Sequence, residues 1–297
     1  MKKEILIPTE TVNPRTKKLD VSSPRQIARL INAEDFNAAR AVQKAGPAIA
    51  KAVDLAAKTF LAGHKIIFIG AGTSGRLGVL EAAECVPTFG TEPEQIIGLI
   101  AGGKEAMFRA KEGAEDDAGQ GGRDVLRLAG KKDFVIGLTA SGITPYVLGA
   151  LKTAHKAGCH TALMACNKKA DTAHADIFIY LPTGPEALNG STRMKAGSAT
   201  KMALNAITTG AMARAGKVYQ NLMVDVRPTN QKLVRRALRL IRAVSGADEQ
   251  TAAQLLQESG RNVKTAIVMH VKNCTRAQAE KRLKKHKGFL AEALREK

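Results

Sequence analysis

Glycines and hydroxyl side chains gather between Gly70 and Arg76, and this composition is the first sign of chemistry in the chain. The stretch follows a short apolar run over residues 65–69 and precedes a helical pattern over residues 77–85. A helix that begins after a glycine-rich turn offers free backbone N–H groups and the positive end of its dipole, and both favour an anion. The predicted contacts to a phosphorylated ligand are Gly72, Thr73, Ser74 and Arg76.

Two other interpretations of this turn stay open at the level of the residues. Gly70, Gly72 and Gly75 have the spacing of a dinucleotide-binding turn, which also needs an acidic residue at the end of the next strand. The next apolar run, 96–100, ends in Ala-Gly-Gly and has no carboxylate there. A glycine turn can also serve only the close packing of a helix on a strand.

Two later stretches repeat the combination of hydroxyls with glycine. Residues 139–145 read TASGITP, and residues 189–198 read NGSTRMKAGS, with two cations just before a helical pattern. Each stretch alone could be a capped turn, but three of them after strands favour one shared site for a phosphate. The further candidate ligands are Ser141, Gly142, Thr144, Ser191, Arg193 and Lys195.

The elements that would position these stretches alternate along the chain. Strand patterns cover residues 65–69, 96–100, 134–139, 161–165 and 177–181. Helical patterns cover residues 38–61, with a break near Gly46-Pro47, and residues 105–117, 145–157 and 195–215; Ser23-Pro24 begins another helix. This alternation predicts an α/β fold, a parallel sheet covered by helices on both faces. Ligands of such sheets bind beyond the C-terminal ends of the strands, where the three stretches fall.

The composition changes after residue 226. Helical patterns over 231–244, 249–258, 263–271 and 275–284 follow one another without strands, and basic residues are frequent. We therefore expect a catalytic domain over residues 1–226, including an N-terminal helical arm, and a small basic helical domain over residues 227–297.

The formal net charge of +19 restricts the classes of partner. Such an excess suits nucleic acid, a membrane surface or an anionic substrate. The chain has no zinc-finger, helix-turn-helix or ribonucleoprotein motif and no apolar stretch long enough to span a membrane, so we expect an anionic substrate, with neither nucleic acid nor membrane as partner.

The cysteines and the first ten residues indicate where in the cell the protein is expected and whether it has a metal site. The four cysteines form no CxxC pair, and no histidine cluster has metal-ligand spacing. The start, MKKEILIPTE, lacks the apolar core of a secretion signal. We expect reduced thiols, a cytoplasmic protein and no metal site.

Several stretches, taken together, resemble one family. GAGTSGRLGVLEAAECVPTFG, AGGKEAMFRAKEGAEDD, TASGITPYV and GSTRMKAGSATKMALN occur in this order, and Thr9-Glu10-x-x-Asn13 precedes them. The hydroxyl-rich loops resemble the phosphosugar-binding sugar isomerase (SIS) domain. Over nearly the whole chain, the set is similar to the N-acetylmuramic acid 6-phosphate etherases.

The resemblance implies an enzyme that cleaves a lactyl ether. The implied substrate is a phosphosugar with D-lactate on C3, and the implied products are N-acetylglucosamine 6-phosphate and D-lactate, in the recycling of cell-wall muramic acid. It implies no metal or organic cofactor, and a homodimer. It also points to Glu84 as the proton donor and to Glu115 as the second catalytic residue.

The chemistry of an ether gives these two carboxyls different requirements. The open-chain aldehyde acidifies the C2 proton, so a base at C2 and an acid at the lactyl oxygen permit elimination, after which water adds at C3. We assign Glu115 as the base, because its acidic surroundings over 112–117 suit a solvated carboxylate. Glu84 is assigned as the acid, and this role requires burial to raise its pKa.

One position departs from the family pattern, and two other functions stay open. Where the family reads Ala-Ser-Gly-Arg-Thr-Pro, this chain has Ile143, so a cation is missing beside a phosphate or lactate-carboxylate subsite. This change bears on affinity and substrate range. The alternatives are a phosphosugar-sensing regulator that resembles the glucokinase regulatory protein, and a phosphosugar isomerase.

Overall fold

The computed structural model describes residues 7–296. The expectation about the start of the chain lies partly outside these residues. The chain divides into two compact units, Met1–Ala83 with Pro93–Thr208, and Glu84–Glu92 with Thr209–Lys297. The second unit is thus larger than the predicted helical domain, and a domain boundary at residue 226 stays a prediction.

A five-stranded parallel sheet forms the centre of the first unit. Its strand order is β2-β1-β3-β4-β5, and every neighbouring pair is parallel. The strands are β1 (Ile66–Gly70), β2 (Ile96–Ile100), β3 (Phe134–Leu138), β4 (His160–Ala165) and β5 (Ile177–Tyr180). This sheet confirms the predicted α/β class.

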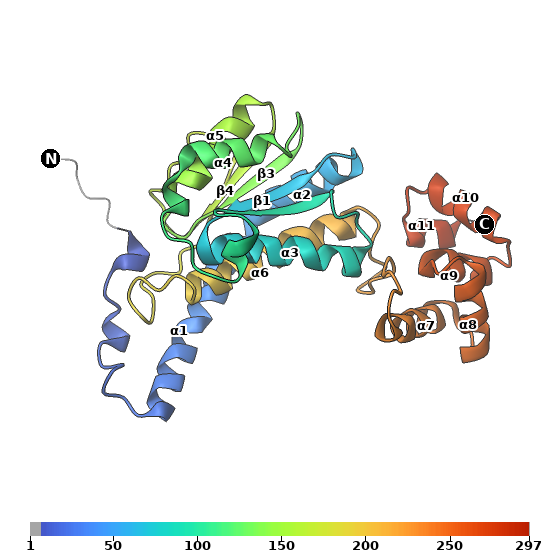
Figure 1. Cartoon of the computed structure of the whole chain (residues 1–297). Coiled ribbons are helices and arrows are strands. Elements are labelled where there is room, and N and C mark those ends of the chain that lie inside the picture. Colours follow the sequence, from blue (N-terminus) through green and yellow to red (C-terminus); the bar gives the residue numbers. More distant parts are fainter. Residues whose placement is uncertain (1–6, 297) are drawn as a thin grey trace. The chain divides into compact units, whose positions relative to one another are not determined.

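Helices cover both faces of the sheet, which is why β1 and β3 are buried along their whole length. Figure 1 shows α4 (Ala118–Leu126) and α5 (Pro145–Lys156) over one face. Ile67 and Ile69 of β1 join the apolar cluster beneath α5. The other face of β1 carries Phe68, and α3 (Gly72–Phe89) packs on it through Gly78, where an added Cβ would lie 2.9 Å from the Cβ of Phe68. Helices α2 (Gly46–Leu61) and α6 (Lys195–Arg214) lie on the same side as α3 (Figure 1).

The N-terminal helices begin and end where their capping residues place them. Ser23 and Gln26 form a capping box at the start of α1, as the Ser-Pro signal predicts. The predicted break near Gly46-Pro47 is confirmed, because α1 ends at Lys44 and the next helix begins at Gly46, but residues 38–44, predicted to begin the second helical pattern, belong to α1. The bounds of α1 are Pro24–Lys44.

Helix α3 begins at Gly72, earlier than the predicted residue 77, so the hydroxyls that follow Gly72 lie in its first turn. Close packing explains the early start. A Cβ on Gly70 would lie 2.7 Å from the backbone N of Gly75, and a Cβ on Gly75 would lie 2.6 Å from the carbonyl oxygen of Gly70. The end of β1 therefore touches the first turn of the helix, and both positions require glycine.

The predicted helix over 105–117 is wrong. The structure has two short 3-10 turns, η3 (Lys104–Met107) and η4 (Ala114–Asp116), and Gly113 between them has φ 72°. Helix α4 begins where the prediction ended, because the Asp117 side chain accepts a hydrogen bond from the N–H of Gln120 and caps it. The glycines in α4 look like helix breakers, but a Cβ on Gly121 would lie only 1.9 Å from a carbonyl of α5.

The second unit contains a bundle of helices with its own apolar core. The predicted bounds of α8 and α9 are confirmed, and those of α7 and α10 differ by one residue at one or both ends; α11 was not predicted. The helices are α7 (Gln231–Ser245), α8 (Glu249–Glu258), α9 (Val263–Val271), α10 (Arg276–Lys285) and α11 (Leu290–Arg295).

Candidate functional site

The first two hydroxyl-rich stretches meet at one edge of the sheet. Gly70, at the end of β1, pairs with Leu138, at the end of β3, so the chain leaves both strands at the same level. In the first stretch, Gly72 is exposed and Thr73 and Ser74 are half-buried in the first turn of α3. The structure therefore places helix N–H groups and these hydroxyls at the edge where a parallel sheet binds its ligand.

Arg76 makes contacts that the sequence did not suggest. Its Nε donates to the carbonyl oxygen of Met107 at 3.1 Å, and its Nη2 donates to that of Arg109 at 3.4 Å. The guanidinium thus holds the loop after β2 against the start of α3. In this arrangement Arg76 orders the loop that leads toward Glu115.

A single hydroxyl organises the second turn. Thr139 is 6% exposed, and its Oγ1 lies 2.7 Å from Oγ1 of Thr144 and 3.3 Å from Oγ of Ser141. The same oxygen accepts the N–H of Gly142 at 3.2 Å, while Ser141 Oγ accepts that of Ile143 at 3.3 Å. The turn therefore presents preordered hydroxyls before α5 begins.

Sequence reasoning did not identify the residue that braces this turn from the next strand. Asn167, 1% exposed, follows β4 and donates from Nδ2 to the carbonyl oxygen of Ser141 at 3.0 Å. Gly142 has φ 78°, and a Cβ there would lie 2.4 Å from that of Ala170. The signal that could have revealed Asn167 is its place just beyond the C-terminal end of a strand. Thr139 carries the same signal.

The third stretch reaches the first one at the start of α6. A Cβ on Gly197 would lie 3.4 Å from Cγ2 of Thr73, so the two helix starts touch. Ser191 is half-buried and Arg193 is exposed in the turn before the helix. These two residues could face a ligand at the same edge of the sheet.

Lys195, in contrast, belongs to the interior of the first unit. Its side chain is fully buried, and Nζ donates to Oε2 of Glu34 at 2.5 Å. Glu34, in α1, also receives Nη2 of Arg15 at 3.0 Å. The hydrogen bond from Arg15, together with Lys195, lowers the pKa of Glu34 from its ordinary value of 4.5 to about 2. The ammonium of Lys195 is therefore engaged in a buried ion pair.

The start of α6 has a second buried carboxylate. Both oxygens of Glu186 are used, because they accept the backbone N–H groups of Lys195 at 3.0 Å and Ala196 at 2.9 Å. Burial raises the pKa of this carboxyl, and the two N–H groups oppose the rise. The Glu186 carboxylate thus takes the place at the N-terminus of α6 where a bound anion would otherwise accept these N–H groups.

The N-terminal segment braces the same loop. Nδ2 of Asn13 donates to the carbonyl oxygen of Pro185 at 3.3 Å, and the N–H of Gly190 donates to that of Thr9 at 3.2 Å. Sequence reasoning noted Thr9 and Asn13 only as part of a resemblance. Their structural role depends on contacts across more than 170 residues of chain, which no local pattern shows.

The two predicted catalytic glutamates have exposed side chains. Glu84 lies twelve residues beyond Gly72 in α3, which is about three helical turns. Glu115 lies in η4, as the solvated carboxylate expected for a base. The apolar wall that we expected around Glu84 is not present among residues 7–296, because the Glu84 side chain is exposed there, although its neighbour Cys85 is buried.

Residues 7–296 bear on the expectations about membranes and metals. No helix in this range is long and apolar enough to cross a membrane. The same residues contain no group of three or more His, Cys, Asp or Glu side chains placed to hold a metal ion.

The central part of the chain is similar to a known domain model and to a solved structure. Residues 48–155 match the model of the glucokinase regulatory protein N-terminal SIS domain. A solved phosphoheptose isomerase from Francisella tularensis superposes with a TM-score of 0.50 at 16% identity, over 65% of this chain and 99% of that one. This likeness shows the fold, and the match of residues 48–155 to an SIS model agrees with the predicted SIS type.

Relatives among curated proteins match almost from end to end. An N-acetylmuramic acid 6-phosphate etherase from Pectobacterium atrosepticum is 50% identical over 288 residues, which are 96% of this chain and 95% of the relative. One from Oenococcus oeni is 48% identical over 290 residues, which are 97% of this chain and 98% of the relative. At this identity and coverage, the chain belongs to the N-acetylmuramic acid 6-phosphate etherase family.

Proposed function

We infer that the protein is a carbon–oxygen lyase that cleaves the D-lactyl ether of N-acetylmuramic acid 6-phosphate. The products are N-acetylglucosamine 6-phosphate and D-lactate, and the reaction serves the recycling of cell-wall sugar. The observation that carries this conclusion is the identity of 50% with an etherase over 96% of the chain. The match to a regulator's SIS domain covers only residues 48–155, so the sensor and isomerase alternatives are not favoured.

We propose that the phosphate binds at the edge of the sheet. Ser74 and Thr73 lie in the first turn of α3, and Ser141 and Thr144 lie in the preordered turn after β3. Neutral hydroxyls and helix N–H groups can together complete the hydrogen bonds of a phosphate. The further candidate ligands are Gly72, Gly142, Ser191 and Arg193. Lys195 and Arg76 are not proposed as ligands, because Lys195 is engaged in a buried ion pair and Arg76 holds the loop after β2.

The two glutamates supply the acid and the base in this proposal. The carboxylate of Glu115 takes the C2 proton of the open-chain sugar, and the electrons of that C–H bond form the C2–C3 double bond. The C3–O bond breaks, and Glu84 protonates the leaving lactate oxygen. Water then adds at C3, and the same pair works in reversed roles, so one water is consumed for each ether cleaved.

To act as an acid, Glu84 must be covered by groups that the single chain does not supply. A carboxyl that donates a proton near neutral pH needs surroundings that raise its pKa, but the Glu84 side chain is exposed in the single chain. We propose a cytoplasmic homodimer in which the second copy and the bound substrate cover this side chain. A sedimentation experiment at micromolar concentration that shows only a 31.6 kDa species would contradict the dimer.

Lactate release in deuterated water tests the reaction and the two roles together. The wild type should release lactate from N-acetylmuramic acid 6-phosphate and exchange the C2 proton. Glu84→Gln should still exchange that proton but release little lactate, whereas Glu115→Gln should do neither. Glu112→Gln, in the same exposed acidic stretch, is the matched control and should behave as the wild type does.

The outcomes separate the alternatives. Binding of the phosphosugar without lactate release by the wild type would indicate a sensor, and exchange without release would indicate an isomerase. Exchange that survives in Glu115→Gln and is lost in Glu84→Gln would reverse the two roles.

A further inference from the structure

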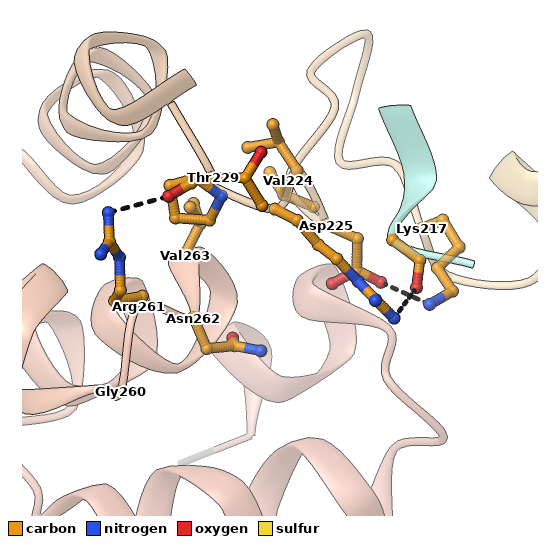
Figure 2. Close-up of a pocket in the computed structure, with 12 residues that line it drawn as sticks. Lys217, Val224, Asp225, Thr229, Gly260, Arg261, Asn262 and Val263 are labelled. Atoms are coloured by element: carbon orange, nitrogen blue, oxygen red, sulfur yellow. Dashed lines mark hydrogen bonds and ion pairs between the residues drawn. The ribbon is translucent and has the colours of Figure 1, made fainter. Parts of the chain in front are cut away.

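The second compact unit contains a pocket of its own, shown in Figure 2. Its volume is about 480 Å³, and its twelve lining residues come from Gly90, from the chain between residues 217 and 229, and from the turn 260–263. None of the residues proposed above for the substrate lines it. The proposed reaction therefore leaves this pocket without a role.

Positive charge dominates the lining. Lys217, Arg227 and Arg261 are cations, and Asp225 is the one carboxylate among the twelve residues. The carboxylate of Asp225 is already engaged, because its Oδ2 lies 3.1 Å from Nζ of Lys217 and 2.8 Å from Nζ of Lys264. Two lysines share one acid, so Asp225 does not oppose the entry of an anion.

Arg227 and Arg261 each have N–H groups that the protein contacts described here do not use. Nη2 of Arg227 donates to the carbonyl oxygen of Gly90 at 3.0 Å and pairs with Glu92. Nη2 of Arg261 donates to the carbonyl oxygen of Pro228 at 2.8 Å, an interaction drawn in Figure 2. A guanidinium has five N–H donors in a planar fork, and these contacts fix the two forks without using all of them. Such forks match the oxygens of a phosphate or a carboxylate.

The floor of the pocket is apolar. Val224, Val226 and Val263 are 1%, 4% and 1% exposed, and they belong to the hydrophobic core of the second unit. The pocket thus places cations beside a packed apolar core, and its volume lies in the range of small-molecule sites. A flat patch of surface cations would lack this hollow.

We propose that this pocket binds a small anion, a phosphorylated or carboxylated molecule of about monosaccharide size, as a second ligand site. Arg227 and Arg261 hold the anionic group, and the rest of the molecule lies in the remaining hollow, beside Thr229 and Asn262. The proposal goes beyond the cleavage reaction and does not depend on it, since no residue of the pocket takes part in the proposed chemistry.

A single reporter can test the pocket, because the chain contains no tryptophan. Thr229 lines the pocket and is exposed, so Thr229→Trp places one fluorophore there. The full-length variant is titrated with N-acetylglucosamine 6-phosphate, with D-lactate and with inorganic phosphate. We expect a saturable fluorescence change, and the probe that binds most tightly shows whether a phosphate or a carboxylate is preferred.

Charge-removing variants decide whether the response comes from the pocket. In the Thr229→Trp background, Arg261→Gln should weaken binding about tenfold or more, the worth of one charge-assisted hydrogen bond. Arg261→Lys keeps the charge without the fork and should weaken it less. Arg239→Gln, an exposed arginine of α7 that does not line the pocket, is the matched control and should change little.

Calorimetry without the tryptophan covers the case in which that residue disturbs the pocket; the wild type is compared with Arg261→Gln, because the two reaction products also bind the proposed active site and only the binding that Arg261→Gln loses belongs to the pocket. A lack of saturable binding in both experiments would overturn the proposal, as would equal weakening by Arg261→Gln and Arg239→Gln. Lactate release is measured on the same variants. Loss of pocket binding with lactate release intact would support a site separate from the reaction, and loss of lactate release in the wild type would count against the proposed function alone.

Discussion

Two stretches of this chain look alike in sequence and do different work in the structure. Residues 139–145 and 189–198 both combine hydroxyls with glycine before a helix. In the first, the hydroxyls of Thr139, Ser141 and Thr144 bond to one another and remain at the edge of the sheet. In the second, Lys195 is buried against Glu34, and Glu186 occupies the end of the helix. A hydroxyl-rich turn therefore indicates a ligand only where its polar groups stay outside the core.

The largest expected effect is on the free energy of unfolding, and it tests whether Lys195 stabilises the fold or binds the substrate. Glu34→Gln should lower the free energy of unfolding by about 3 kcal/mol or more, because it leaves the buried ammonium of Lys195 without its carboxylate. Lys195→Met should also destabilise the protein while leaving KM for the phosphosugar close to that of the wild type. Urea unfolding and steady-state kinetics measure the two effects.

Arg193→Gln is the matched control for this prediction. Arg193 lies two residues before Lys195 but is exposed, so its loss should change the stability by less than about 0.5 kcal/mol. If Lys195→Met unfolds as the wild type does and raises KM strongly, then the lysine binds the substrate and the contrast between the two stretches is lost.

A dependence on pH should follow from the same ion pair. The folded-state pKa of Glu34 is lowered from 4.5 to about 2, first by the hydrogen bond from Arg15. A lowered pKa stabilises the folded state above the unfolded-state value, and this contribution is lost as the pH falls from about 4.5 toward 2. The difference in stability between the wild type and Glu34→Gln, measured by urea unfolding, should therefore narrow between pH 5 and pH 3. A difference that stays constant over this range would show that Glu34 does not titrate as described.

The smallest expected effect concerns the first two turns. Ser74→Ala and Ser141→Ala should each raise KM for the phosphosugar about tenfold, or about 1.4 kcal/mol, because each removes one hydrogen bond to a charged phosphate. Ser198→Ala serves as control, since this exposed serine belongs to the third stretch and lies inside α6. Unchanged KM in both Ser74→Ala and Ser141→Ala would remove the phosphate from these turns.

The sequence predicted much of the fold because its signals there are local. The apolar run of β2, the Ser-Pro start of α1 and the bounds of α8 and α9 depend on residues that are neighbours in the chain. The helix predicted over residues 105–117 was wrong, although its residues also gave a local signal. Its residues favour a helix, but Gly113 takes a left-handed conformation and Asp117 caps a helix that begins later.

The sequence by itself determined the parallel sheet, the order of the three hydroxyl-rich stretches and the family. Only the tertiary structure decided which polar groups remain available to a ligand. Lys195 and Glu34 are 161 residues apart in the chain. The Thr139 hydroxyl contacts Ser141, Gly142 and Thr144 only because the folded turn surrounds it. Glu84 is exposed although small and apolar residues flank it in sequence. Burial decides these cases, because a charge that the folded chain encloses and pairs, as it does Lys195 with Glu34, cannot reach a ligand, and its partner comes from a distant segment.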